Sequence, residues 1–245
     1  MATTKTTAVV ETPIPETNDP LYRAKGFWDR YSKAIIYVGS AIILLIVGWF
    51  AYQHFIKLPR EKEANKQIIA AEAIVDKMGT TGFNKDSVGL ALNGGAVEGK
   101  KITGLLKVIS NYGGTKAGNR AKYLVGASYL QVGDYDKAIK YLKEYEGNDA
   151  KQVQSLAYKM LGDAYAQKKN TDEAFSYYKK AASVNEKDES FTPNILMIAA
   201  SYAQAIGKSK DAVELYKKVK DKYPTSSPVT NGDVDKELAS LGEFN

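Results

Sequence analysis

The sequence contains no cysteine and a single histidine, His54. The lack of cysteine excludes disulfide bonds and thiolate metal ligands, and it leaves open an oxidising or a reducing compartment. Triad chemistry needs a histidine beside the nucleophile, and His54 stands at the end of an apolar run with no residue nearby to complete a metal site. We therefore predict a binding protein that is not an enzyme and that uses no cofactor and no metal.

The chain also lacks a strong charge of one sign. Its 34 lysine and arginine residues and 28 aspartate and glutamate residues give a net charge of +6 over 245 residues. This excess is spread along the sequence, and no zinc-finger, basic-region or RNA-recognition pattern accompanies it. We expect no nucleic-acid partner and no small-molecule substrate.

One long apolar run is present, from Ala34 to Ile56, and it holds 23 residues without a charged side chain. At about 1.5 Å per residue, roughly 20 helical residues cross a hydrocarbon core of about 30 Å. The run starts late and ends in aromatic residues, whereas a cleaved signal peptide has a shorter run and a small-residue cleavage site. We predict an uncleaved transmembrane helix over residues 34–56.

The charges beside the span do not orient it, because four lysine or arginine residues lie close to it on each side. Within the span, small residues recur every seven positions, which places them on one helical face that a neighbouring helix can approach. They are Ala34, Ala41 and Gly48. The alternative is that small residues are simply common in membrane helices.

The first 33 residues form the N-terminal tail. Residues 1–20 are rich in threonine, proline and glutamate, which predicts disorder. Phe27, Trp28 and Tyr31 alternate with basic residues, which fits either a segment in the lipid headgroups or a solvated flank.

Residues 57–114 read as a linker helix and a degenerate helical hairpin. A helix is predicted from Glu61 to Met78, where Gly79 ends it, and a second from Lys101 to Tyr112. The six glycines between residues 79 and 99 predict a loop, with a possible short strand at Val88–Leu92. The residues expected to face inward are Ala64, Ile68, Ala71, Val75, Ile102, Leu105, Leu106 and Ile109.

Residues 94–100 match the phosphate-binding pattern G-x-x-x-x-G-K, which raises a nucleotide-binding enzyme as an alternative. The pattern is incomplete, because Lys101 stands where a serine or threonine would bind magnesium. Glu98 would also place negative charge beside the phosphate. A flexible loop is the preferred interpretation.

Three later segments carry the same order of small and aromatic residues. In each, a small residue precedes a tyrosine by three positions, and an alanine follows nine or ten positions later. The segments are GASY at 126–129 with Ala138 and Leu142, GDAY at 162–165 with Ala174 and Tyr178, and AASY at 199–202 with Ala212 and Tyr216. The period of 36 to 38 residues predicts stacked helix hairpins.

Residues 115–226 therefore resemble three tetratricopeptide repeats (TPRs), although tryptophan is missing from the first consensus position and the repeats are lengthened. Residues 227–245 follow as a capping segment, with a short helix expected at Val234–Leu241. The predicted fold class is all-α, with a single N-terminal transmembrane helix followed by a TPR-like α-solenoid.

The resemblance implies a concave face lined by the first helix of each hairpin. Gln131, Gln167 and Gln204 occupy the same place in the three repeats, where an amide suits an extended peptide backbone. A solvated polar position is the alternative. The implied partner-binding residues are Arg120, Tyr123, Gln131, Lys159, Asp163, Gln167 and Gln204.

The whole arrangement resembles the YfgM-like ancillary subunits of the bacterial SecYEG translocon. The resemblance rests on GWFAY at 48–52, the lysine- and glutamate-rich helix after it, and NYGGTKAG at 111–118. It implies a single-pass protein of the bacterial inner membrane with a cytoplasmic N-terminus and a periplasmic repeat domain. The implied partners are SecYEG-type subunits, a periplasmic prolyl-isomerase-like chaperone and emerging secreted proteins. The alternative is a scaffold or assembly factor of another cell-envelope or secretion complex.

Overall fold

The structure is a computed structural model that describes residues 20–97, 99–148 and 150–244. Most of the predicted disordered tail, residues 1–19, lies outside the described residues. The chain divides into two units, residues 1–57 and residues 58–245.

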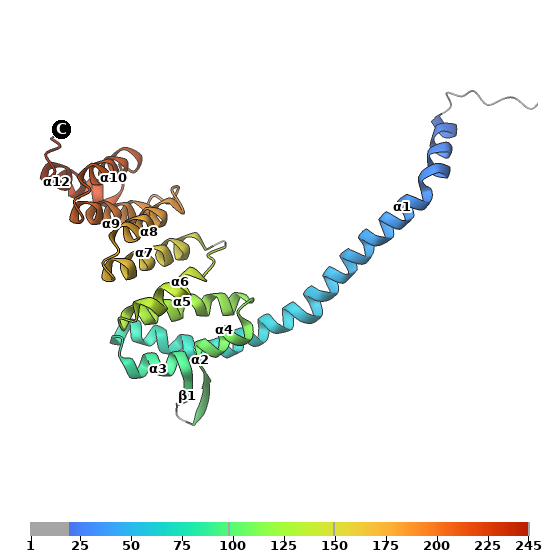
Figure 1. The fold of residues 1–245 in the computed structure, drawn as a ribbon, viewed down its shortest axis with the longest axis horizontal. Helices are drawn as coiled ribbons and strands as arrows, with labels where there is room; N and C mark the ends of the chain where they lie inside the picture. The colour runs from blue at the N-terminus through green and yellow to red at the C-terminus, as the bar shows by residue number, and fades with distance from the viewer. Residues whose placement is uncertain (1–19, 98, 149, 245) are drawn as a thin grey trace, which may run out of the picture. The chain divides into compact units, whose positions relative to one another are not determined.

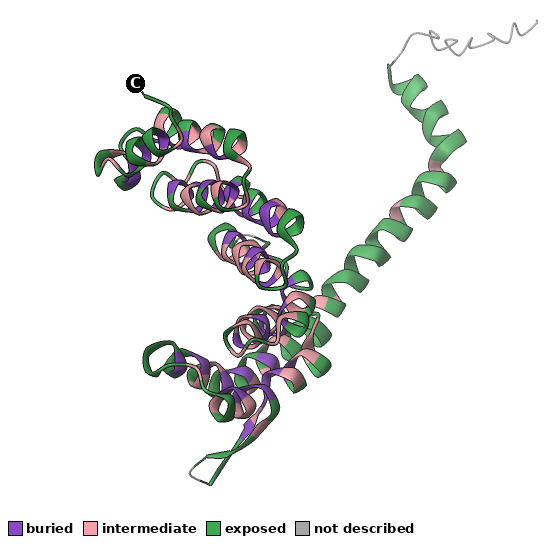
Figure 2. Ribbon diagram, turned by 60° about the vertical axis from the view of Figure 1, so that its left-hand side comes forward, coloured by how far each residue is buried: buried purple, intermediate pink, exposed green. Residues whose placement is uncertain are grey.

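The described part of the first unit, residues 20–57, is one long helix. Helix α1 (Pro20–Ala51) passes into a π-helical turn, η1 (Tyr52–Lys57). Its apolar side chains are exposed along the predicted span, and the helix is long and apolar enough to cross a membrane (Figures 1 and 2). The helix already begins at Pro20, so Phe27, Trp28 and Tyr31 are helical.

The second unit begins with α2 (Leu58–Thr81), which continues two residues past Gly79. The predicted apolar stripe of this helix is confirmed, because Ala64, Ile68 and Ala71 are fully buried and Val75 is 7% exposed. Apolar residues at these spacings share one side of a helix, and here that side packs against the helices that follow.

The predicted loop at residues 79–99 is wrong. The segment contains helix α3 (Lys85–Asn93) and strand β1 (Gly94–Val97), which pairs with β2 (Lys100–Thr103). Asn84 caps α3 by accepting the backbone N–H of Ser87 at 2.8 Å. The possible strand at 88–92 is therefore a helix, whose apolar side is buried at Val88, Ala91 and Leu92.

The G-x-x-x-x-G-K pattern lies on this antiparallel hairpin, in which Gly94 pairs with Thr103 and Val97 pairs with Lys100. A phosphate-binding loop instead leads directly into a helix whose N-terminus holds the phosphate. Because residues 100–103 are a strand, α4 (Leu105–Tyr112) begins four residues later than predicted. The nucleotide-binding alternative does not fit this geometry.

Three helix hairpins follow in successive layers (Figure 1). They are α5 (Lys116–Gln131) with α6 (Tyr135–Lys143), α7 (Lys151–Gln167) with α8 (Thr171–Ser183), and α9 (Thr192–Ala205) with α10 (Ser209–Lys222). Asp134 and Asn170 cap α6 and α8 through their side chains. The chain closes with α11 (Ser227–Thr230) and α12 (Asp233–Ser240), where Val234 and Leu238 are buried.

The repeated small residues explain how closely the paired helices approach. A Cβ atom on Gly126 would lie 2.6 Å from Cγ of Leu142, and the alanines Ala138, Ala174 and Ala212 are fully buried. Tyr178 also packs with Ala199 of the next hairpin. Apart from the β1–β2 hairpin, all regular secondary structure of the described residues is helical, which confirms the all-α solenoid.

Candidate protein-binding site

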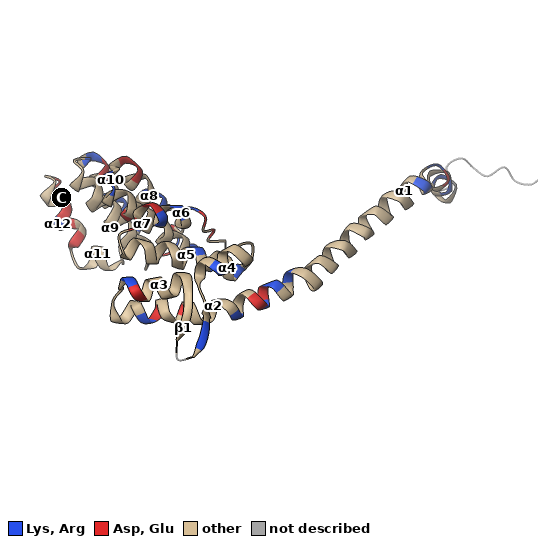
Figure 3. Ribbon diagram, turned by 60° about the horizontal axis from the view of Figure 1, so that its bottom comes forward, with Lys and Arg blue, Asp and Glu red and all other residues tan. Residues whose placement is uncertain are grey.

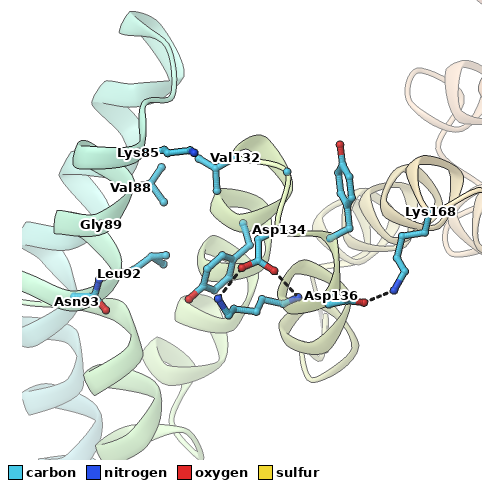
Figure 4. Close-up of a pocket in the computed structure, with 13 residues that line it drawn as sticks. Lys85, Val88, Gly89, Leu92, Asn93, Val132, Asp134, Asp136 and Lys168 are labelled. Carbon is cyan, nitrogen blue, oxygen red and sulfur yellow. Dashed lines mark hydrogen bonds and ion pairs between the residues drawn. The ribbon is translucent and has the colours of Figure 1, made fainter.

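A cavity of about 740 Å³ lies between α3 and the turn that joins α5 to α6 (Figure 4). Its lining comes from three layers of the second unit, because Lys168 of the second repeat also reaches it. The lining residues are Lys85, Val88, Gly89, Leu92, Asn93, Tyr129, Val132, Gly133, Asp134, Tyr135, Asp136, Lys137 and Lys168.

On the α3 side of the cavity, Val88, Gly89 and Leu92 lie between the polar residues Lys85 and Asn93. Val88 and Leu92 are almost fully buried beside it, and Val132 contributes from the opposite layer. Gly89 stands between the two α3 residues, and a Cβ atom there would meet nothing within 4 Å. A partner can therefore approach the backbone of α3 closely at Gly89.

The opposite side of the cavity carries paired charges. The carboxylate of Asp134 accepts the backbone N–H of Lys137 at 3.3 Å and lies 2.6 Å from Lys137 Nζ. The hydrogen bond from the Lys137 side chain holds the pKa of Asp134 below its ordinary value. Lys168 forms an ion pair with Asp136 of the preceding hairpin. These contacts hold the α5–α6 turn in place. The carboxylates of Asp134 and Asp136 keep further positions at which they can accept hydrogen bonds.

Tyrosine rings support the same layers. Lys137 Nζ lies 5.0 Å from the ring centre of Tyr129, whose ring stacks on Tyr141 at 5.9 Å. The second hairpin repeats this stack 36 residues later, with Tyr165 and Tyr177 at 5.5 Å. The aromatic pair thus recurs as a structural element of the repeats.

An apolar floor beside charged and hydroxyl groups suits a segment of polypeptide, which offers both apolar side chains and backbone hydrogen-bonding groups. Within the described residues, no group of three or more histidine, cysteine, aspartate or glutamate side chains is placed to hold a metal ion. Lys85, Gly89 and Tyr135 were not predicted from the sequence as site residues. Periodicity identifies buried faces, whereas this cavity depends on how α3 packs beside the first repeat.

Two of the predicted partner-binding residues, Arg120 and Tyr123, line a second cavity of about 320 Å³. Arg120 also pairs with Glu72 of α2 at 2.8 Å, and the ring of Tyr123 lies 5.4 Å from that of Tyr145. Arg120 is nevertheless exposed, and Tyr123 is half-buried.

Lys159 and Asp163 form an ion pair at 2.8 Å on α7. Asp163 also accepts the hydroxyl of Tyr178 at 2.8 Å, so its carboxylate connects the two helices of the second hairpin. Both residues therefore have structural partners within the repeat.

The three glutamines lie in the last turns of α5, α7 and α9 but have different surroundings. Gln131 is exposed, and Gln167 Oε1 lies 3.5 Å from the hydroxyl of Tyr135. Gln204 accepts the hydroxyl of Tyr216 at 3.3 Å and donates to Ser240 of α12 at 3.2 Å. The capping helix therefore engages the third glutamine, while the first is open to solvent.

Ala34, Ala41 and Gly48 lie on α1 and are exposed. A Cβ atom on Gly48 would meet nothing within 4 Å. Their packing against a partner helix stays a prediction.

Comparison with known proteins supports the repeat assignment. Residues 123–190 and residues 194–226 each match a tetratricopeptide repeat family. A comparison with curated proteins finds no match. Proteins built from these repeats are generally scaffolds that bind other proteins. Residues 123–190 and 194–226 are therefore identified as tetratricopeptide repeats, which indicate a role in protein–protein interaction, and a candidate membrane helix precedes them.

Proposed function

We propose that this protein is a single-pass membrane adaptor that associates with a SecYEG-type translocon. In this role it links the channel to periplasmic chaperones, such as a prolyl isomerase, or to emerging secreted proteins. The N-terminus is cytoplasmic and the repeats are periplasmic in the bacterial inner membrane. The motifs at 48–52 and 111–118 and the order of span, linker helix and repeats support this proposal.

The observation that carries the adaptor function is the cavity between α3 and the first repeat. Val88, Gly89 and Leu92 line its α3 side, and proteins built from tetratricopeptide repeats generally bind other proteins. The exposed Gln131 is the last residue of α5, just before the α5–α6 turn, and it extends the polar surface of the cavity. In this proposal the cavity holds the protein partner, while Arg120, Tyr123, Lys159, Asp163, Gln167 and Gln204 contribute further surface.

The candidate membrane helix supports a second contact. Ala34, Ala41 and Gly48 recur every seven residues on one side of α1, and such a row of small residues suits close packing on a channel helix. The alternative function is a scaffold or assembly factor of another envelope or secretion complex, because such a protein uses the same anchor and repeats.

Purification of the full chain from cross-linked native membranes in mild detergent tests the proposal. SecY-type subunits should co-purify, and replacing Ala34, Ala41 and Gly48 together by leucine should reduce their recovery. A matched variant with Ile36, Ile43 and Phe50 replaced by leucine controls for a changed helix surface. Recovery of another envelope complex without SecY-type subunits would support the alternative and reject the translocon assignment.

A separate experiment tests the orientation. Because the chain has no native cysteine, Lys236→Cys on α12 provides one labelling position in the repeat unit. A membrane-impermeant maleimide should label it in intact spheroplasts if the repeats are periplasmic. Labelling only after lysis would reverse the proposed orientation.

A further inference from the structure

The excess positive charge of the second unit lies in the part of the sequence that follows the candidate membrane helix. Residues 58–120 contain ten lysine or arginine and six aspartate or glutamate residues, whereas residues 121–245 contain eighteen of each. The repeats after residue 120 are therefore neutral, and the excess positive charge lies on the segment that follows the anchor. Figure 3 shows basic residues at the start of α2 and on the β-hairpin.

Eight lysines of this segment are exposed and form no ion pair with any described residue. Three carboxylates of the segment, by contrast, have partners within it. Glu61 accepts the backbone N–H of Lys116, and Glu63 accepts the side-chain amide of Gln67. Glu72 forms an ion pair with Arg120. The basic groups are thus more available to an external ligand than these acidic groups. The eight lysines are Lys62, Lys66, Lys77, Lys85, Lys100, Lys101, Lys107 and Lys116.

Exposed apolar side chains accompany these lysines. Ile69 is 62% exposed, and its spacing from Lys62 and Lys66 places all three on the side of α2 opposite the buried stripe. Val97 is 37% exposed and pairs with Lys100 in the hairpin. Basic and apolar side chains exposed together are typical of surfaces that bind the interface of a membrane.

The connection of the chain keeps this surface near the bilayer. Helix α2 starts at Leu58, directly after η1. At about 1.5 Å per residue, Ile69 lies within roughly 20 Å of Ile56, whatever the direction of α2. The hairpin is attached to the same part of α2, because Thr103 donates to Gln67 Oε1 at 2.5 Å.

We propose that α2 and the β1–β2 hairpin bind the surface of a membrane that contains anionic lipids. The lysine ammonium groups contact lipid phosphates, and Ile69 and Val97 enter the headgroup region. This contact holds the start of the repeat unit at the bilayer and adds to the affinity that the anchor provides. This proposal concerns lipids alone. If the lipid contact is not found, the proposed protein partners are unaffected, and if those partners are not found, the lipid contact is unaffected.

An environment-sensitive dye on Val97→Cys tests this proposal in the full chain, which has no native cysteine. The protein is placed in nanodiscs of phosphatidylcholine alone or mixed with phosphatidylglycerol. The emission of the dye should shift to the blue in the anionic discs, and added salt should reverse the shift. The same dye on Lys236→Cys should not respond, because α12 closes the opposite end of the repeats.

A charge exchange identifies the residues responsible. Lys100→Glu with Lys101→Glu should abolish the blue shift, whereas Lys179→Glu with Lys180→Glu, the same exchange on exposed residues of α8, should preserve it. Unchanged thermal unfolding of each variant shows that it is folded. If the first variant does not fold, the proposal is judged by whether added salt reverses the blue shift of the dye-labelled protein in which all lysines are intact. Equal emission in both kinds of disc, or equal loss with the two exchanges, would overturn the proposal.

Discussion

Gly162 lies directly under the ring of Tyr178, so that a Cβ atom on Gly162 would be 2.7 Å from Cδ1 and Cε1 of that ring. The Tyr178 hydroxyl in turn donates to Asp163 at 2.8 Å. Burial and the nearby Asp163 carboxylate raise the pKa of Tyr178. The second hairpin is therefore closed by one glycine, one ring and one hydrogen bond.

Gly162→Ala should destabilise the repeats by about 1–3 kcal/mol, because the added methyl group forces the Tyr178 ring out of its position. Gly79→Ala is the matched control, since a Cβ atom at this helical glycine meets nothing within 4 Å. The control should gain up to about 1 kcal/mol from helix propensity. Urea unfolding followed by tyrosine fluorescence measures both, and equal effects would contradict this account of the hairpin.

Two buried serines should respond oppositely to the same substitution. Ser128 is fully buried, and its hydroxyl has no hydrogen-bond partner among the described residues, whereas the Ser155 hydroxyl donates to the carbonyl of Ala181 at 2.7 Å. Ser128→Ala should leave the free energy of unfolding unchanged or raise it by about 1 kcal/mol. Ser155→Ala should lower it by about 1–2 kcal/mol, because the Ala181 carbonyl loses its donor. A loss of stability in the Ser128 variant alone would reverse this assignment.

The Glu186 carboxylate makes the stability of the third hairpin depend on pH. Hydrogen bonds from Lys222 and Lys218 lower the pKa of Glu186 to about 2. A lowered pKa stabilises the fold at pH values above about 4.5, and this contribution disappears as the pH falls toward about 2. Because the pair is partly exposed, it should contribute about 1 kcal/mol or less.

Glu186→Gln should therefore destabilise the protein at neutral pH, and the difference from the unaltered chain should shrink between pH 4.5 and pH 2. Denaturant unfolding at several pH values measures this difference. Asp221→Asn on α10 is the control, because this exposed carboxylate forms no ion pair with any described residue. A constant difference at all pH values would argue against the Glu186 contacts.

Filling the cavity should weaken partner binding without unfolding the protein. Gly89→Leu projects a side chain into the open space at α3, and leucine is also a better helix former than glycine. Thermal stability should be equal or higher, while recovery of the protein partner should fall at least fivefold. Gly79→Leu provides the same chemical change on α2, away from the cavity lining, and should preserve recovery. Loss of recovery with both variants would show that the cavity is not the responsible surface.

The repeat hairpins could be predicted from sequence because each requires the same small residue, tyrosine and alanine at nearly constant spacing. The buried side of α2 was equally predictable, since Ala64, Ile68 and Ala71 follow helical periodicity. Helix α3 was missed because Gly89 and its glycine-rich flanks have weak helix propensity, which packing of Val88 and Leu92 overcomes. The cavity was missed for a related reason: it is formed where α3 meets the α5–α6 turn, and no local pattern records that contact.

A photo-reactive residue at Gly89 in living cells tests the central claim most directly. After illumination, mass spectrometry identifies any protein joined to the cavity, with a photo-reactive residue at Lys236 as the control. The account predicts an adduct with a SecY-type subunit or a periplasmic chaperone from Gly89 and none from Lys236. The absence of a protein adduct from Gly89, or the same adducts from both positions, would contradict it.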